Sequence, residues 1–418
     1  MTDEPILESD GGADWPANRP SLTPEELEAR AASDRQAGFV ISENFRRFSQ
    51  RDDVFNRAWW DPEVMSDDVA AFYAAHRKPD PRKGDGYTQW DFALLNASWS
   101  VARDFAGRGM AKGRREGFLD PFEVFVPQAE QQAELPPVPE VTDRIRSVAA
   151  FLGADLVGVT AYDERWTYTH SADISSESRA EKPNDWLDGM TSVIVLGHEM
   201  ERSLVQAYPS ALAAAATGRE YSHEAAIVTS LASFINGLGF RAVATSNDTA
   251  LAIPYAIQAG LGEYGRNQMV ITKEFGPRVR FSKVFTDLPL VHDKPTRFGV
   301  GETCNACTKC AEACPPKALP KGPPQEVGPD RSNVSGVTKW SADCNKCFTY
   351  WTKLRADCAI CMRVCPYNRD YSKWRNRRFR DLLNGPLRGL MLWLDARFDI
   401  NRRVAPKDWW RTASADSG

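Results

Sequence analysis

The cysteines of this chain gather in one short region, and their spacing limits how that region can fold. The first run has the pattern C-x2-C-x2-C-x3-C followed by proline, and its residues are Cys304, Cys307, Cys310, Cys314 and Pro315. A second region repeats the ending C-x2-C-x3-C-P, and its residues are Cys358, Cys361, Cys365 and Pro366, with Cys344 and Cys347 before them. Such tight spacing lets one loop surround an iron–sulfur cluster, because each sulfur reaches a different corner of it.

In bacterial ferredoxins the fourth cysteine of such a run binds the other cluster of a pair. We therefore predict two 4Fe–4S clusters that exchange one ligand. The ligands of the first cluster are Cys304, Cys307, Cys310 and Cys365. The ligands of the second are Cys314, Cys347, Cys358 and Cys361, with Cys344 as an alternative to Cys347. Zinc is the alternative metal, since C-x2-C pairs also bind zinc, but the triple run with proline favours clusters.

Length and charge bound the remaining possibilities. A chain of 418 residues is long enough for two or three packed units. The net charge of −4 provides no general attraction to nucleic acid or to an anionic membrane, so we expect no nucleic-acid partner. No apolar run approaches the roughly 18 residues of a membrane span. The acidic N-terminus lacks a secretion signal, and the Arg46-Arg47 pair is followed by charged residues. We expect a cytoplasmic protein with reduced thiols.

The pattern from the linker Phe125–Val141 onward is α/β. Buried strands are predicted at ADLVGVTAY, TSVIVLGHEM and FRAVATS, and two more strands flank the turn Phe275-Gly276-Pro277. Helices are predicted at VTDRIRSVAAFLG and over Tyr221–Leu238, and an N-terminal helix at SLTPEELEARAA has Ser21 or Thr23 as its cap. Alternation of strands and helices favours a sheet with helices on both faces.

The chain therefore divides into five predicted segments. Residues 1–20 are acidic, rich in Gly and Pro, and predicted to be disordered. An aromatic-rich segment with its linker spans 21–140, and the α/β core spans 141–298. The two-cluster domain spans 299–370, and a basic tail that packs on the core spans 371–418.

Two neighbouring clusters can transfer electrons from one to the other. Because some 300 residues precede them, we expect this part of the chain to hold the redox site that the clusters supply with electrons. The segment GLGEYG has the glycine pattern of a dinucleotide site. However, LAIPYAIQA before it is helical in pattern, not the strand that a nicotinamide site requires. We interpret Gly260, Gly262 and Gly265 as positions where backbone approaches a flat ligand, and we expect Arg266 and Asn267 to contact the same cofactor. No D-x-H-x-x-G cobalamin motif is present.

The order of several segments resembles the corrinoid-dependent reductive dehalogenases and, more weakly, the epoxyqueuosine reductases that act on tRNA. These segments are FRRFSQRDDVFNRAWWD, GLGEYGRNQMVITKEFGPRVRFSKVFTDLPL, CNACTKCAEACP, CFTYW, CAICMRVCPYN and DWW. The resemblance covers roughly residues 40–411. It implies a nitroreductase-like α/β (α+β) core that holds base-off cobalamin, with a C-terminal domain like a bacterial ferredoxin that reduces the corrinoid to Co(I).

The resemblance also implies a site for removing halide from an organohalide. Tyr221 lies where the family has a tyrosine that donates a proton, and Asn247 and Arg280 lie where it has polar and basic companions. A nearby guanidinium favours phenolate, so we expect the pKa of Tyr221 to be lowered. Glu220 and His223 flank this tyrosine. An aromatic-rich N-terminal segment favours a haloaromatic substrate, although core packing is the usual role of such residues.

Three functions stay open at this point. A reductive dehalogenase is favoured, with a separate ferredoxin, flavodoxin or reductase as the expected electron donor, since the chain shows neither an export signal nor a fused reductase. Epoxyqueuosine reduction is the second function; CFTYW argues against it, and the basic SKWRNRRFR segment argues for it. A non-catalytic electron carrier is the third, and it predicts clusters without corrinoid. The sequence leaves the oligomeric state unknown.

Overall fold

The computed structural model describes residues 22–74, 76–79, 84–111, 128–172, 181–183, 187–247, 249–398 and 401–415. Residues 1–20, which the sequence predicts to be disordered, lie outside these ranges. Across the described ranges, no helix has the length and apolar character needed to cross a membrane.

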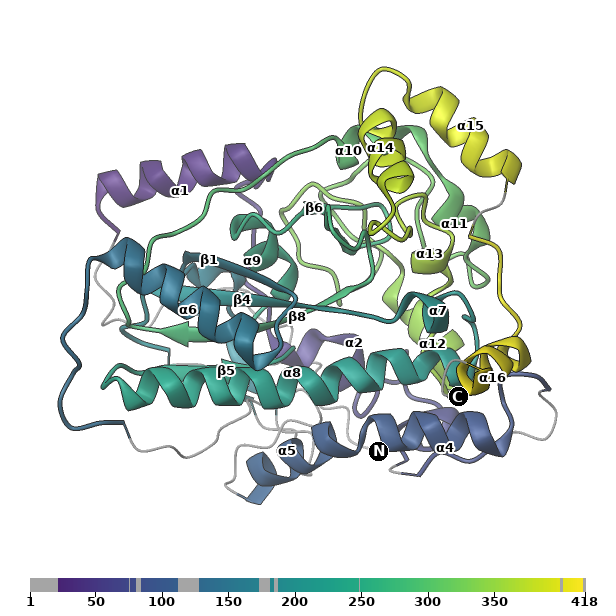
Figure 1. Cartoon of the computed structure of the whole chain (residues 1–418), viewed down its shortest axis with the longest axis horizontal. Coiled ribbons are helices and arrows are strands. Elements are labelled where there is room, and N and C mark those ends of the chain that lie inside the picture. Colours follow the sequence, from purple (N-terminus) through teal and green to yellow (C-terminus); the bar gives the residue numbers. More distant parts are fainter. Residues whose placement is uncertain are drawn as a thin grey trace, which may run out of the picture.

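A four-stranded antiparallel sheet forms the centre of the fold (Figure 1). Its strands follow the order β1 (Leu156–Ala161), β4 (Ser192–Glu199), β8 (Val279–Thr286) and β5 (Ala242–Thr245). β4 is a buried apolar run, which is the composition of a central strand with both faces covered. These strands are four of those predicted from the sequence, and they are confirmed.

Helices cover both faces of the sheet, as the alternation of elements predicts. Side chains of a strand alternate between its two faces, so Ile194 packs with the helices α6 (Val138–Leu152) and α8 (Ala211–Gly237), whereas Val195 packs with α9 (Ala252–Gln258). The long helix α8 runs along the sheet in Figure 1. It begins ten residues before the predicted start, and Ser210 caps it by accepting from the Ala213 amide.

The prediction of two strands around Phe275-Gly276-Pro277 is correct for the turn, but the two strands belong to different sheets. β7 (Val270–Ile271) pairs with β6 (Glu263–Tyr264), whereas β8 pairs with β4 and β5. Gly276 has a φ of 60°, and a Cβ there would collide with the Tyr367 carbonyl. The turn therefore redirects the chain from a small ribbon into the central sheet.

The segment before the core wraps around it. Thr23 caps α1 (Pro24–Ala37) through a capping box with Glu26, as predicted. The other elements of this segment are η1 (Gln50–Asp52), α2 (Val54–Arg57), α3 (Asp67–Tyr73), α4 (Gln89–Ser98) and α5 (Ser100–Ala111). The described part of the predicted linker is tied to the end of α8, since the Ala129 and Ala133 amides donate to Asn236 and Leu238 carbonyls.

Short elements complete the chain. Within the core they are η2 (Glu164–Trp166), β2 (His170–Ala172), β3 (Glu181–Pro183) and α7 (Arg202–Val205). The cysteine region holds α10 (Val300–Ala306), α11 (Lys309–Ala313), α12 (Cys344–Leu354) and α13 (Ile360–Arg363). The tail holds α14 (Trp374–Leu383), α15 (Arg388–Phe398) and α16 (Pro406–Ala415). α16 contacts α4 and α7, since the Trp410 indole donates to Asp91 Oδ1 and the Trp409 indole donates to Ser203 Oγ, both at 2.9 Å. The described residues thus form a mixed α/β fold.

Candidate functional site

The structure brings Tyr221, Asn247 and Arg280 together from three different elements. Tyr221 projects from α8 and is 5% exposed. Asn247 follows β5, and its amide donates to the Tyr221 hydroxyl. The Arg280 guanidinium, on β8, lies 3.7 Å from the centre of the Tyr221 ring. Because β5 and β8 are neighbours and α8 packs on both, the sheet itself sets this arrangement.

Trp99 and Glu224 belong to the same group. Trp99 is part of the aromatic-rich segment expected to favour a haloaromatic substrate, whereas sequence reasoning did not identify Glu224. Trp99 stacks on Tyr221 with ring centres 4.7 Å apart. Glu224 is fully buried one turn after Tyr221, and its Oε2 lies 4.0 Å from Arg280 Nε. Ser246 donates to Glu224. The i, i+3 spacing of Tyr221 and Glu224 on a helix is the signal that could have identified this carboxylate.

The protonation of Tyr221 differs from the expectation. Burial raises the pKa of Tyr221, and the opposing effect of Arg280, which lowers this pKa, is smaller. The phenol is therefore neutral and keeps its proton, because the ring is surrounded by protein and desolvation disfavours phenolate. The sequence prediction of a lowered pKa considered only the guanidinium.

His198 pairs with Arg280 across the strands β4 and β8. Burial lowers the pKa of His198 to about 3, and the Arg280 charge acts in the same direction. The neutral imidazole shares a hydrogen bond of 2.8 Å with the Ser282 hydroxyl. A second neutral group thus lies beside the Arg280 cation.

Glu220 and His223, which flank Tyr221 in sequence, point to another side of α8. Glu220 is buried, and its carboxylate lies 3.4 Å from Arg219 and 3.7 Å from the His223 ring. Burial raises the pKa of Glu220 to about 7. Burial lowers the pKa of His223, which is half exposed.

Asn247 is one of the residues that line a cavity of about 500 Å³. This cavity extends between α9, the β6–β7 ribbon and the cysteine region. Its aromatic lining residues are Phe39, Phe55, Trp166, Tyr168, Tyr264 and Trp340. Its amide side chains are those of Asn247, Gln268, Asn305 and Asn333, and the cavity reaches Cys344. The cavity is therefore lined both by Asn247, the hydrogen-bond partner of Tyr221, and by Cys344.

The glycines of GLGEYG lie where the protein itself leaves little room for a side chain. Gly260 has a φ of 75°, and a Cβ there would lie 2.7 Å from the Lys294 carbonyl oxygen. A Cβ on Gly262 would collide with the Ile271 carbonyl, and one on Gly265 would lie 2.9 Å from Asn267 Oδ1. Close approach to protein backbone therefore accounts for the small side chains at Gly260 and Gly262. Cofactor contact by these glycines stays a prediction.

Arg266 and Asn267 lie at the first cysteine run. The Arg266 guanidinium donates to the carbonyls of Cys304 and Cys307, at 2.8–3.1 Å, and to that of Gly322 at 2.7 Å. The Arg266 amide lies 3.5 Å from Cys304 Sγ. Asn267 Nδ2 is buried without a hydrogen-bond partner among the described residues. Arg266 and Asn267 therefore contact the loop of the first cysteine run, and neither residue lines the large cavity.

Four cysteines from the two runs surround one small cavity, together with Asn267 and Tyr367. These cysteines are Cys304, Cys307, Cys310 and Cys365, the same four that the ferredoxin pattern assigns to the first cluster. The unpartnered Asn267 Nδ2 belongs to this cavity as a donor. Within the ranges that the structure describes, no group of three His, Cys, Asp or Glu side chains is arranged to hold a single metal ion.

The other cysteines form a second neighbourhood. The thiol of Cys347 interacts electrostatically with those of Cys358 and Cys314, and Cys361 interacts with all three. Cys344 interacts with Cys347 and with acidic groups, and it lines the large cavity instead. The geometry favours Cys347 over Cys344 as the fourth member of this set. Ligation itself stays a prediction.

Comparisons with known proteins agree with this arrangement. The model of the family "Reductive dehalogenase subunit" matches residues 189–290, which include Tyr221, Asn247 and Arg280. The tetrachloroethene reductive dehalogenase of Dehalobacter restrictus (strain DSM 9455 / PER-K23) is 32% identical over 346 residues, 68% of this chain and 63% of that protein. An epoxyqueuosine reductase of Leadbetterella byssophila is 27% identical over 266 residues, 55% of this chain and 80% of that one.

Solved structures share the fold. The catabolic reductive dehalogenase NpRdhA, in complex with 3-bromo-4-hydroxybenzoic acid, matches with a TM-score of 0.69 and 21% identity, over 87% of this chain and 48% of that chain. A reductive dehalogenase structure that suggests a mechanism for B12-dependent dehalogenation matches with a TM-score of 0.68.

The extent of these matches is partial. This chain spans less than two thirds of the length of the curated dehalogenases that it matches first, 63% of the Dehalobacter protein. The range matched by the family model contains the Tyr221 group, and the 32% identity with the Dehalobacter protein extends over 68% of this chain. The chain is therefore similar to the reductive dehalogenases, whose family model matches its residues 189–290, and to the epoxyqueuosine reductases.

Proposed function

We propose that this chain is a cobalamin-dependent reductive dehalogenase that catalyses R–X + 2e⁻ + H⁺ → R–H + X⁻. The observation that carries the proposal is the neutral, buried Tyr221, whose hydroxyl accepts a hydrogen bond from Asn247, a residue that lines a large cavity together with Cys344. The proposal includes a nitroreductase-like core, a ferredoxin-like cysteine domain and two 4Fe–4S clusters.

The cavity suits a corrinoid in the chemistry of its walls. Aromatic side chains offer flat apolar surfaces, and the amides of Gln268, Asn305 and Asn333 offer donors and acceptors for the amide groups of a corrin. None of the described residues that line the cavity is a histidine, in agreement with a base-off cofactor without a histidine ligand. These residues would hold the group. Bound cobalamin supplies a strongly reducing cobalt centre.

The residues of this chain supply the proton and its control. Tyr221 holds a proton on its Oη, because burial keeps the phenol neutral. Asn247 orients that oxygen by donating to it, so the Tyr221 proton points away from the amide. When the proton leaves toward the substrate carbon, Arg280 beneath the ring stabilises the phenolate that forms. Glu224 and Trp99 hold the Arg280 side chain and the Tyr221 ring in place.

The two cysteine sets deliver electrons one at a time. The first set surrounds one cavity, and the second lies next to it, since Cys361 interacts electrostatically with Cys310 of the first. Such a pair conducts single electrons, which matches the two one-electron transfers that the reaction needs.

We propose a haloaromatic substrate, in agreement with the bromohydroxybenzoic acid bound to NpRdhA. Six aromatic side chains contribute to the apolar wall of the cavity, and aromatic rings pack well against each other. The named activity of the curated relatives, on tetrachloroethene, makes chlorinated alkenes the competing class. The cytoplasmic location and a separate ferredoxin, flavodoxin or reductase as donor stay predictions of the sequence.

Anaerobic reconstitution tests the proposal. The protein is supplied with iron, sulfide and hydroxocobalamin and desalted, and its visible and EPR spectra are recorded. Stoichiometric base-off cobalamin excludes the electron-carrier alternative, and halide release from bromophenols compared with turnover of epoxyqueuosine tRNA separates the two enzymes. Two clusters without bound corrinoid, even in excess, would show that the chain is an electron carrier and that Tyr221 has no catalytic role.

A further inference from the structure

We infer that an acidic one-electron carrier protein docks on the exposed surface of α14 and α15 and reduces the first cysteine cluster. The α14–α15 surface consists of Trp374, Leu387, Leu390, Trp393 and Phe398 with Lys373, Arg375, Arg377, Arg378 and Arg397. This inference rests on the proposed function, because it requires a cluster at Cys304, Cys307, Cys310 and Cys365.

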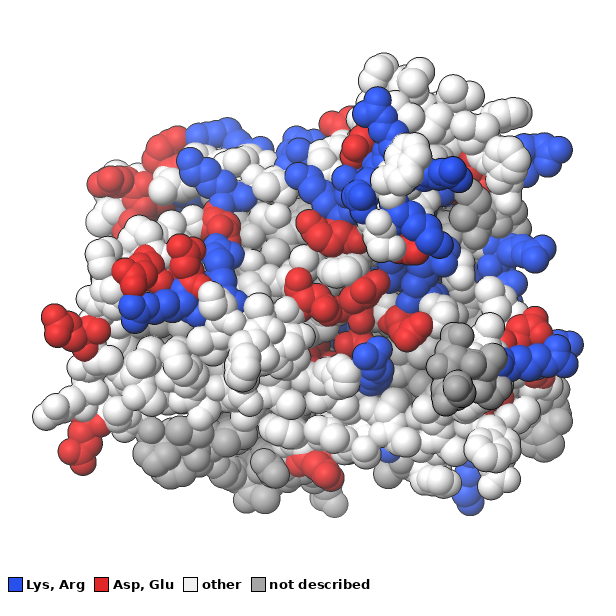
Figure 2. Space-filling view, viewed as in Figure 1, with Lys and Arg blue, Asp and Glu red and all other residues white. Residues whose placement is uncertain are grey.

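The charge of this surface is opposite to that of the whole chain. Residues 370–398 carry seven Lys or Arg and three Asp, whereas the net charge of the protein is −4. The arginines of α14 are mostly exposed, and Figure 2 shows Lys and Arg gathering over this helix. Asp395 is buried and pairs inward with Lys309 and Arg369. Asp370 and Asp381 pair with Lys373 and Arg380, so the positive charge of the surface comes mainly from the other arginines. A compact positive field attracts acidic partners and speeds their association.

The apolar part of the surface has the composition of a protein interface. Leu390 and Trp393 are 50% and 61% exposed, and their spacing places them on one side of α15. Leu387 and Phe398 extend the apolar surface at the two ends, and Trp374 adds a ring from α14. Tryptophan and arginine are the residues most enriched at interface hot spots. The outer part of α15 is white in Figure 2, next to the blue of α14.

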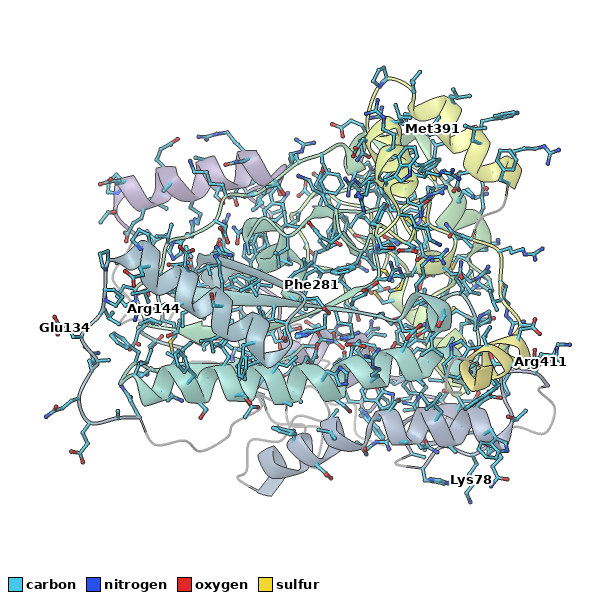
Figure 3. All side chains as sticks on the ribbon, in the orientation of Figure 1. Lys78, Glu134, Arg144, Phe281, Met391 and Arg411 are labelled. Atoms are coloured by element: carbon cyan, nitrogen blue, oxygen red, sulfur yellow. The ribbon has the colours of Figure 1, made fainter. Side chains whose placement is uncertain are left out.

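The inner face of α15 rests on the first cysteine run. Arg388 donates from its Nε to Thr303 Oγ1 at 3.1 Å, next to Cys304, and Lys309, next to Cys310, pairs with Asp395. Met391, labelled in Figure 3, packs in one apolar cluster with Cys365. A partner on the outer face would be separated from this loop by a single helix, about 10 Å thick.

The redox step is balanced without protons. A reduced carrier loses one electron and becomes oxidised, the cluster gains that electron, and two such encounters supply the pair that dehalogenation consumes. The carrier is an acidic iron–sulfur or flavin protein, since the surface is positive and its apolar centre suits a second protein surface.

The test compares donors on the reconstituted protein. An acidic 2Fe–2S ferredoxin, kept reduced, and methyl viologen serve as donors, and the rate of cluster reduction is followed by stopped-flow absorbance. We expect the double variant Arg375→Glu and Arg378→Glu to be reduced about tenfold more slowly by ferredoxin, with a weaker dependence on salt. Reduction by methyl viologen should be unchanged. Arg144→Glu on α6, an exposed arginine far from this surface (Figure 3), is the matched control and should resemble wild type.

Other outcomes overturn the inference. Equal slowing with both donors, or unchanged reduction by ferredoxin, excludes docking at this surface. A wild-type dimer that Trp393→Gln separates in light scattering would make the surface an interface between two copies. Trp393-dependent binding to anionic phosphatidylserine vesicles would make it a membrane contact. Cluster reduction needs neither corrinoid nor an organohalide, so this test can still be made if the protein releases no halide. If no clusters form on reconstitution, the proposed function is refuted, and with it the cluster that this inference requires.

Discussion

Replacement of Tyr221 by phenylalanine separates the chemistry of this side chain from its packing. The ring stays between Trp99, at 4.7 Å, and Arg280, at 3.7 Å, and only the hydroxyl that accepts from Asn247 is lost. Loss of one such hydrogen bond costs about 0.5–1.5 kcal/mol of unfolding free energy. Loss of a general acid slows a reaction about 10²–10⁴-fold, which corresponds to about 3–5 kcal/mol of activation free energy.

The assay is anaerobic halide release from a bromophenol, measured per bound corrinoid, together with urea unfolding. Tyr208→Phe is the matched control, because Tyr208 is also fully buried and its hydroxyl makes one hydrogen bond of 3.0 Å, to Thr217. We expect Tyr208→Phe to lose a similar amount of stability while halide release stays within about threefold of wild type.

The result that refutes this reasoning is equally specific. If Tyr221→Phe releases halide at more than about a tenth of the wild-type rate, the proton comes from another group or from solvent. If both variants lose activity together, the effect belongs to packing around α8 rather than to the Tyr221 proton.

Three further predictions concern protonation, ligation and packing. Burial raises the pKa of Glu220 from 4.5 to about 7. The stability that its protonated form contributes is therefore lost as pH rises through this interval. In urea unfolding, Glu220→Gln should flatten the fall of the unfolding free energy between about pH 5 and about pH 8. Cys347→Ser should lose the iron of one cluster, whereas Cys344→Ser should keep the wild-type iron content in a colorimetric assay. Gly262→Ala should destabilise the fold by about 1–3 kcal/mol in urea unfolding, because the added methyl collides with the Ile271 carbonyl.

Local patterns in the sequence were enough to predict the main elements of the fold. The strand at residues 192–199 is a continuous apolar run, and helix α6 begins after a proline-rich stretch, so each signal lies within the element itself. The partner of each strand is not a local property. Residues 270–271 and 279–286 flank one turn, yet their hydrogen bonds go to different sheets, and nothing near the turn encodes that difference.

The candidate site divides in the same way. The spacing of Cys304, Cys307 and Cys310 is a local pattern in the sequence. The ferredoxin pattern of two such runs predicts that Cys365 joins them, and these four residues line one cavity. The reason for the glycines could not be settled from the sequence, because a small residue has the same appearance whether backbone or ligand approaches it. Gly262 meets Ile271, a residue of the neighbouring strand, and only the folded chain reveals that contact.

The pKa of Tyr221 shows why a neighbouring charge is a weaker guide to the direction of a pKa shift than burial is. A guanidinium at 3.7 Å from the ring stabilises phenolate, yet the same guanidinium is shared with the buried carboxylate of Glu224, which favours the neutral phenol. Desolvation is the largest cause of the raised pKa of Tyr221, and Glu224 acts in the same direction. For a proton donor this balance is useful, since a phenol that had already lost its proton at neutral pH would have none to give. Arg280 then acts after the proton leaves, when the phenolate that it stabilises has formed. Removing Glu224 should therefore shift Tyr221 toward phenolate, which connects a residue without sequence motif to the chemistry at the cavity.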